Sequence, residues 1–214
     1  INNRVDKGRR GMEGITAGNE FAGDYATPEQ QVGKFDNINA WETCMTIASQ
    51  WAWKPNDTMK SEKECIQTLL QTVGGDGNLL FNVGPMLDGR MEQRQIDRLK
   101  EMGEWLNTNG DAVYGTRGGP YLPTENMVST RKGNKIYLHL FKKLEGDLVL
   151  PFPKNVKINK SYFLDGGANA IFERRKDSLI IKLPDTLPDE IASVLVLDLG
   201  NSAMEMKVIQ RINY

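Results

Sequence analysis

Hydrophobic positions recur with the period of an α-helix in two segments of the chain. The first segment, residues 61–73, has apolar residues spaced i, i+3, i+4 and i+7: Ile66, Leu69, Leu70 and Val73. Ser61 and Glu64 have the spacing of a capping box at its start, and Gly74 follows it. The second segment, residues 93–109, has four apolar residues on one face: Ile96, Leu99, Met102 and Leu106. These patterns predict two amphipathic helices.

An apolar run of strand length lies between the two helical patterns. Residues 78–85, NLLFNVGP, follow a glycine-rich stretch and are typical of a parallel strand buried on both faces. The order helix, strand, helix predicts an α/β unit. In barrels of alternating strands and helices the active site forms where the strands end, so residues 82–90 are a candidate rim loop. Asp88 in this loop is interpreted as a loop-forming residue.

The pattern changes after Pro120. Turn signals such as Asp165-Gly166-Gly167 separate short segments rich in β-forming residues. Seven strands are predicted: residues 127–130, 135–141, 147–150, 156–164, 170–174, 178–183 and 193–197. This pattern is typical of an antiparallel β-sandwich. We therefore predict an α/β domain over residues 1–120 and an all-β sandwich domain over residues 121–214.

Composition narrows the function classes. The 214 residues are 39% hydrophobic and 26% charged with a net charge of −1, values typical of a globular protein. Short basic clusters and the lack of a long apolar run argue against nucleic-acid and membrane partners. One histidine, His139, and two cysteines provide no plausible metal-ligand set, and no metal or cofactor is expected. His139 is interpreted as a strand residue, so any acid/base chemistry would fall to carboxylates.

Residues 1–57 show little periodicity and are expected to form long loops with short elements. The stretch GDYATPEQ has two interpretations. Thr27, Pro28 and Gln30 suit an N-cap, a first helical residue and the end of a capping box, with Glu29 merely favouring the helix dipole. Alternatively, a stiff Pro-Glu in a loop presents the Glu29 carboxyl to a substrate as a general acid. Asp24 in the same stretch is interpreted as a turn residue.

Two further residue types near this stretch suit a binding site. Trp41, Trp51 and Trp53 lie within AWETCMTIASQWAW, where their rings suit either a core or an apolar ligand patch. Arg4 offers a fixed fork of donors, which could orient a hydroxyl-rich ligand or a carboxylate or could simply be solvated.

Five sequence blocks carry a family resemblance. In order they are NRV, GDYATPEQ, WETCMTI followed by W-x-W, GGDGNLLFNVGPMLDG and GEWLNTNGDAVYGTR, spread over about 115 residues. This order resembles the second half of the catalytic domain of the family 29 α-L-fucosidases. LLFNVGPMLDG is similar to that family's strand and loop, and the later β-rich region is similar to the sandwich that follows its barrel. The resemblance therefore implies the later part of a (β/α)8-like barrel followed by a β-sandwich.

The resemblance also implies a chemistry and a set of site residues. Enzymes of this family are retaining glycosidases that remove terminal α-L-fucose with an aspartate nucleophile and a glutamate acid/base. Glu29 matches the acid/base, Arg4 the arginine that contacts fucose, and Trp51 the aromatic residue near the sugar's methyl group. Trp41, with Glu42, matches the WE of the family pattern; a structural role is favoured for it, and it is also named as a substrate-binding candidate. The implied partner is a fucosylated oligosaccharide or glycoconjugate, and the implied location is secreted, periplasmic or lysosomal.

The matching blocks cover only part of the family's pattern. The motifs of its nucleophile and of its fucose-binding histidines are absent from the chain, and about 115 residues cannot close a barrel that takes roughly 250. The chain also opens at Ile1 without an initiator methionine, so we expect it to belong to a longer protein whose upstream part holds the nucleophile. Two alternatives stay open: a protein that binds glycans without cleaving them, and a related exo-glycosidase for another sugar. The oligomeric state is not predicted.

Overall fold

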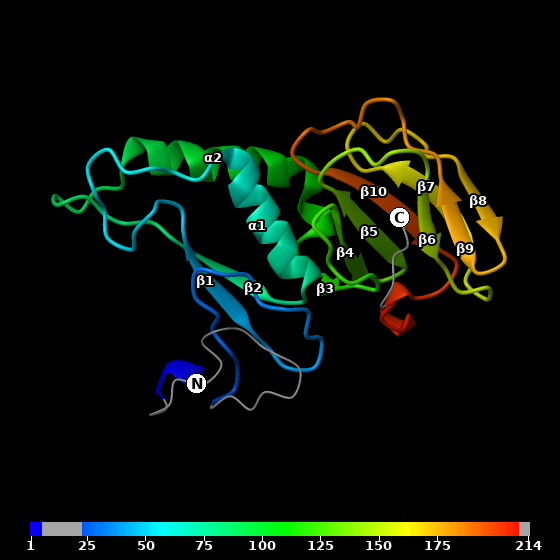
Figure 1. The fold of residues 1–214 in the computed structure, drawn as a ribbon, viewed down its shortest axis with the longest axis horizontal. Helices are drawn as coiled ribbons and strands as arrows, with labels where there is room; N and C mark the ends of the chain where they lie inside the picture. The colour runs from blue at the N-terminus through cyan, green and yellow to red at the C-terminus, as the bar shows by residue number, and fades with distance from the viewer. Residues whose placement is uncertain (6–22, 210–214) are drawn as a thin grey trace. The chain divides into compact units, whose positions relative to one another are not determined.

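The computed structural model describes residues 1–5 and 23–209 (Figure 1). They form two compact units, residues 1–107 and 108–214, which are described separately. The predicted division at residue 120 lies beyond the boundary between these units, and as a domain boundary it stays a prediction. No helix in the described ranges is long and apolar enough to cross a membrane.

Both predicted helices of the first unit are confirmed. Helix α1 spans Glu62–Gly74, and helix α2 spans Gln93–Asn109. The last two residues of α2 lie beyond residue 107, where the first unit ends. The predicted capping box is present: the Ser61 hydroxyl accepts a hydrogen bond from the Glu64 N–H at 3.2 Å, and the Glu64 carboxylate accepts one from the Ser61 N–H at 2.7 Å. Local sequence alone therefore sets where α1 begins, because these two bonds satisfy donors that the first helical turn leaves unpaired.

Four stretches of backbone in this unit run parallel to one another. Strand β1 (Glu42–Thr46) pairs with strand β2 (Asn78–Asn82) in parallel register. Isolated parallel bridges extend this arrangement away from β2: Glu29 with Cys44, Ala26 with Trp41, and Asn2 with Tyr25. The order across the sheet is therefore residue 2, residues 25–29, β1 and β2. The sequence predicted only loops with short elements here, and it did not resolve their parallel pairing.

The two faces of this small sheet differ. Trp41 is 1% exposed and lies against Gly75 and Gly77, which follow α1 directly, whereas Leu80 of β2 points to the opposite face and is 51% exposed. The prediction that residues 78–85 are buried on both faces is therefore wrong. Only residues 78–82 form the strand, and helix α1 packs on one side of it (Figure 1). The apolar run correctly predicts a parallel strand. It does not indicate whether other residues cover both faces of that strand.

The second unit is built from two antiparallel sheets. The first sheet has the strand order β3-β4-β5-β10-β7 and the second has the order β6-β9-β8 (Figure 1). The strands are β3 Arg117–Gly118, β4 Met127–Lys132, β5 Lys135–Leu140, β6 Leu148–Pro151, β7 Ile158–Phe163, β8 Phe172–Arg175, β9 Ser178–Ile181 and β10 Ser193–Leu199. Short 3-10 helices are present in both units: η1 Asn3–Val5, η2 Gly110–Ala112 and η3 Ala203–Glu205. All seven predicted strands are confirmed, and β3 is an addition of two residues.

One hydrophobic core joins the two sheets of this unit. Leu138 and Leu195 come from the five-stranded sheet, Leu150 and Leu179 come from the three-stranded sheet, and all four are fully buried. The coarse fold class, a mixed helix and sheet region followed by an all-β region, is therefore confirmed.

His139 lies on β5 and is fully buried, as its interpretation as a strand residue requires. The Thr130 hydroxyl donates to the Ala112 carbonyl at 2.6 Å and lies 3.0 Å from His139 Nε2, so this nitrogen carries the proton and donates to Thr130. His139 Nδ1 has no hydrogen-bond partner among the described residues. Burial lowers the pKa of His139 to about 3, which keeps the ring neutral.

We expect His139 to make the folded state sensitive to acid. Because its pKa is lower in the folded chain than in the unfolded one, the unfolded state binds the extra proton first, and stability falls as the pH drops below about 6.5. Between pH 7 and pH 5 this group should remove about 2 kcal/mol from the free energy of unfolding. Urea unfolding of wild type and His139→Gln at both pH values measures the difference. Equal losses in the two proteins would contradict this role.

Candidate active site

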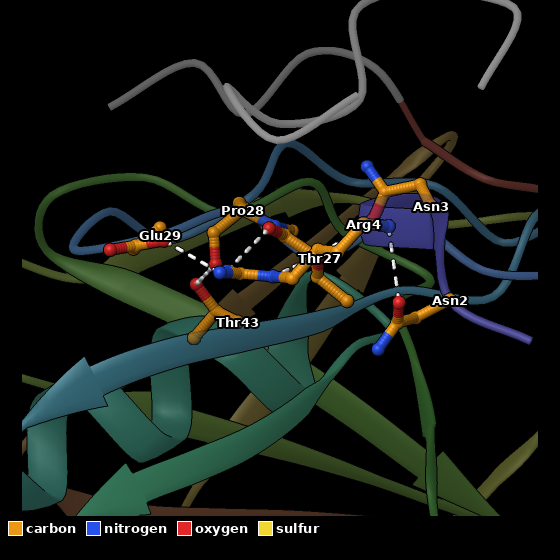
Figure 2. A network of polar contacts seen from close by, with 7 residues as sticks. All are labelled: Asn2, Asn3, Arg4, Thr27, Pro28, Glu29 and Thr43. Carbon is orange, nitrogen blue, oxygen red and sulfur yellow. Dashed lines mark hydrogen bonds and ion pairs between the residues drawn. The ribbon is translucent and has the colours of Figure 1, made fainter. Parts of the chain in front are cut away.

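Two of the sequence-predicted site residues form an ion pair. Arg4 Nη1 lies 2.7 Å from Glu29 Oε2, and the two side chains are 31% and 32% exposed (Figure 2). Arg4 belongs to the 3-10 helix η1, and Glu29 lies on the stretch that pairs with β1. The fold thus places an acid and a guanidinium, 25 residues apart in sequence, side by side in a partly solvated position.

The guanidinium of Arg4 also forms hydrogen bonds with Thr27. Its Nε donates to Thr27 Oγ1 at 2.8 Å and its Nη2 to the Thr27 carbonyl at 3.3 Å (Figure 2). The Thr27 hydroxyl in turn donates to Asn3 Oδ1 at 2.6 Å, and both Thr27 and Asn3 are buried. The Arg4 N–H donates to Asn2 Oδ1 at 3.1 Å. Since the planar fork is fixed along two edges, its orientation is set before any ligand arrives.

Thr27 to Gln30 do not begin a helix, and the N-cap prediction is wrong. The Pro28 carbonyl accepts from the Cys44 N–H at 2.9 Å, and the Gln30 N–H donates to the Cys44 carbonyl at 2.9 Å. Gln30 then turns the chain with φ at +54°. Pairing with β1 satisfies the backbone groups that a helix would have paired internally, and the Thr27 hydroxyl serves Arg4 and Asn3 rather than a helix end.

Glu29 and Trp41 lie on opposite faces of the parallel stretch. Ala26 pairs with Trp41, and Glu29 is three residues further along, so the alternation of side chains sends it to the other face. The indole of Trp41 is buried, and its Nε1 donates to the Gly75 carbonyl at 3.3 Å. Trp41 is therefore a core residue beneath the sheet, which agrees with its structural interpretation and gives no support to a role in substrate binding.

Trp51, the remaining predicted site residue, is exposed at 38%. It lies beyond the end of β1, and its carbonyl accepts from Asn82 Nδ2 at 2.9 Å. Asn82 ends β2 and opens the predicted rim loop. Trp51 therefore belongs with the loops that leave the carboxyl ends of β1 and β2. Its backbone is linked to the rim loop through Asn82.

The two aspartates that were not assigned to catalysis lie in turns. In the rim loop, Asp88 Oδ1 accepts from the Arg90 N–H at 3.1 Å, next to Gly89 with φ at +82°. This confirms Asp88 as a loop-forming residue. The Asp24 N–H donates to the Ile1 carbonyl at 2.7 Å, directly after Gly23 with φ at +85°. Asp24 is thus part of a bend, as interpreted.

Sequence reasoning missed two kinds of neighbour around Glu29. Asn3 and Thr27 support Arg4, and the only sequence signal for them was their adjacency to the nominated residues.

Cys44 is the register partner of Glu29 and lies on the same face. Burial, and then the nearby Glu29 and Glu42 carboxylates, raise the pKa of the Cys44 thiol against the opposing effect of Arg4. The thiol is therefore protonated near neutral pH and is a neutral neighbour of the acid.

The site's residues suit proton transfer and the orientation of a polar ligand. A partly exposed carboxyl group can give or take a proton, and the fixed guanidinium beside it can donate to hydroxyl groups or stabilise negative charge. In residues 1–5 and 23–209, no three His, Cys, Asp or Glu side chains cluster to hold a metal ion.

The comparisons with known proteins place the chain in a family of glycoside hydrolases. The chain belongs to the alpha-L-fucosidase family, whose sequence profile matches residues 1–111. The resemblance noted from the five sequence blocks is thereby confirmed.

Known relatives come from animals and bacteria. The plasma alpha-L-fucosidase of Pongo abelii is 42% identical over 127 residues, which cover 54% of this chain and 27% of that protein. The structure of alpha-L-fucosidase isoenzyme 1 from Paenibacillus thiaminolyticus is 29% identical with a TM-score of 0.73, covering 85% of this chain and 46% of that one. A family 29 alpha-L-fucosidase from Bacteroides thetaiotaomicron is 25% identical with a TM-score of 0.78, covering 93% and 48%. The chain thus spans about a quarter of the first protein and just under half of the two solved structures.

Proposed function

We propose that the chain is part of a retaining α-L-fucosidase that hydrolyses terminal α-L-fucose from glycoconjugates, with Glu29 as the general acid/base. The observation that carries this proposal is the Arg4–Glu29 ion pair on the stretch that runs parallel to β1. Family membership supports the substrate class, because the related proteins are named for this activity.

The proposed reaction has two steps. In the first step, Glu29 protonates the oxygen of the leaving group while a second carboxylate attacks the anomeric carbon. In the second step, Glu29 removes a proton from water, which releases fucose from the covalent intermediate. The two carboxyl groups must lie roughly 5 Å apart for this chemistry. Since Glu29 fills only the acid/base role, we place the nucleophile outside these 214 residues.

One related structure supports the retaining course. The Bacteroides thetaiotaomicron alpha-L-fucosidase was trapped as a covalent intermediate with 2-fluoro-fucosyl fluoride, using a mutant in which a glutamate is replaced by glutamine. A covalent sugar intermediate is the defining species of a double displacement. We carry this mechanism to the present chain as part of the proposal.

We also propose that the first unit is the later part of a (β/α)8-like barrel, with the catalytic domain over residues 1–120 and a sandwich domain over residues 121–214. The parallel order of residue 2, residues 25–29, β1 and β2 supports it, since the strands of such a barrel are all parallel. So does the placement of Trp51 and the rim loop beyond the carboxyl ends of β1 and β2, where barrel active sites form.

The stereochemical course tests the proposed function. The full-length protein is incubated with an aryl α-L-fucoside, and the first fucose released is followed by proton NMR before its anomers equilibrate. A retaining double displacement must release α-L-fucose first. Initial release of the β anomer would contradict the mechanism, and binding without any release would favour a glycan-binding protein.

Replacing Arg4 by lysine should lower kcat/KM about 10- to 100-fold. Lysine keeps the charge but cannot bind Thr27 and Glu29 together through a planar fork, so the orientation toward the sugar is lost. Steady-state kinetics of the full-length variant measures the effect. Arg175→Lys is the matched control, because Arg175 pairs with Glu173 on the exposed surface of the second unit. An Arg4→Lys enzyme with wild-type kcat/KM would remove Arg4 from substrate orientation.

A further inference from the structure

The segment that carries Trp51 is closed at its base by one buried carboxylate. We call residues 49–58 the tryptophan loop. Asp57, 5% exposed, accepts hydrogen bonds from the Ser49 N–H at 3.2 Å and from the Thr58 N–H at 2.9 Å, and also from the Ser49 hydroxyl. These bonds, with the Ser49 hydroxyl contributing most, lower the pKa of Asp57 and keep it ionised. Asp57 therefore ties the two ends of the loop together.

A second carboxylate anchors the middle of the tryptophan loop to helix α2. The Trp53 Nε1–H donates to Glu92 Oε2 at 2.8 Å. The other oxygen of Glu92 accepts from Arg94 Nε at 2.5 Å, and Arg94 Nη1 donates to the Asp57 carbonyl at 2.9 Å. The Glu92 side chain is 16% exposed and directly precedes the first residue of α2. Glu92 thus links the loop to a rigid element, both through Trp53 and through Arg94.

The rim loop holds the same segment from a second side. A Cβ atom added to Gly84 would lie 2.6 Å from the Trp53 backbone nitrogen, so the two loops are in close backbone contact. Two residues earlier, the side chain of Asn82 binds the Trp51 carbonyl. The backbone of residues 51–53 is therefore fixed, while the Trp51 side chain remains 38% exposed. A fixed backbone that presents an exposed indole is suited to binding an apolar ligand face at a low cost in conformational entropy.

We propose that Glu92 is a positioning residue for substrate binding: it acts through Trp53 to hold the tryptophan loop so that Trp51 is preorganised against the apolar face of the sugar. This inference rests on the proposed function and on the match of Trp51 to the family's aromatic residue near the sugar's methyl group. Glu92 itself touches no reacting atom. Its loss would leave the Trp53 N–H and Arg94 without their shared acceptor and would release the loop from α2.

The test compares three variants of the full-length protein. Glu92→Ala removes the acceptor, Glu92→Gln keeps one for Trp53, and Asp97→Ala changes an exposed carboxylate within α2 as the control. KM and kcat are measured on an aryl α-L-fucoside, and hydrogen exchange is measured on peptides covering residues 48–59. We expect Glu92→Ala to raise KM about five- to twentyfold with kcat changed less than twofold, and to speed exchange in the loop at least threefold. Glu92→Gln should restore most of KM, and Asp97→Ala should match wild type.

Each other outcome overturns a stated part of the proposal. Unchanged exchange in Glu92→Ala would show that Glu92 does not hold the loop. Faster exchange with unchanged KM would show that the loop is held but takes no part in binding substrate. An equal fall in kcat for Glu92→Ala and Asp97→Ala would indicate a general structural effect. Absence of fucoside hydrolysis by the wild type would instead overturn the proposed function, while the exchange data would still report whether Glu92 holds the loop.

Discussion

Replacing Glu29 by glutamine is expected to lower kcat/KM on natural fucosides by about 100- to 10,000-fold, the range that general acid/base catalysis contributes. Glutamine has nearly the same shape and still offers an oxygen to Arg4 Nη1, so the ion-pair geometry should survive as a hydrogen bond. What the variant loses is a proton that can be given to the leaving oxygen and a base that can activate water. The variant should therefore keep the folded structure and lose catalytic activity.

The leaving group separates this role from a merely structural one. An activated aryl fucoside needs little protonation as it leaves, so Glu29→Gln should be impaired less on its first step than on natural glycosides. Added formate or azide should partly restore turnover of the aryl substrate, because a small nucleophile can replace the water that Glu29 no longer activates. Steady-state kinetics on both substrates, with and without azide, measures these effects.

The matched control for this substitution is Glu104→Gln. Glu104 is an exposed residue of α2, so its replacement tests the change from glutamate to glutamine away from the site. We expect it to match wild type on both substrates. Equal activity of wild type and Glu29→Gln on natural fucosides would exclude Glu29 from the mechanism. A variant that is inactive on every substrate, without rescue, would point to a loss of binding or of the fold rather than of acid/base catalysis.

Gly77→Ala is expected to cause a large loss of stability in the first unit. A Cβ atom at residue 77 would lie 2.4 Å from Trp41 Cε2 and 2.5 Å from Cδ2, well inside contact distance. The indole has little room to move aside, because a Cβ atom added to Gly33 or to Gly75 would also lie within 3 Å of the ring. Overpacking of this kind costs about 3 kcal/mol, since the ring, the strand or both must shift.

Thermal and urea unfolding of the full-length variants measures this cost. Gly103→Ala is the control: residue 103 lies inside α2, and a Cβ there meets nothing within 4 Å. Alanine is the better helix former, so this control should gain up to about 1 kcal/mol. Adding Trp41→Phe to Gly77→Ala should recover part of the loss, because the smaller ring leaves room for the methyl group. A Gly77→Ala protein as stable as wild type would show that the indole is not enclosed as described.

Local patterns predicted much of the fold. Helix α1 was predicted from the apolar spacing of four residues and the Ser61–Glu64 box, both of which act within a few residues of one another. Helix α2 and the seven strands of the second unit followed in the same way from period and turn signals. Strand β1 was not resolved because its five residues, ETCMT, carry no periodic pattern and become a strand only by pairing with neighbours on both sides.

The predictions that failed are those in which a distant partner overrides a local preference. Thr27 to Gln30 have the composition of a helix start, yet β1 supplies the hydrogen bonds that a helix would have made. Trp41 was both a structural and a substrate-binding candidate, and its burial in the core supports the structural role. Composition could not choose between a core and a ligand role, since an indole suits both.

The sequence by itself determined the helices, the succession of an α/β region and an all-β region, the identity of Glu29 and Arg4 as the candidate site residues, and the family. These follow from contacts within a few residues or from blocks of sequence in a fixed order. Only the tertiary structure decided that Arg4 and Glu29 form an ion pair, and that Thr27, itself bound to Asn3, holds Arg4. It also decided that Trp41 is buried and that Trp51 is exposed. The physical reason is that side-chain direction in a parallel sheet depends on register, and register is set by partners far away in sequence.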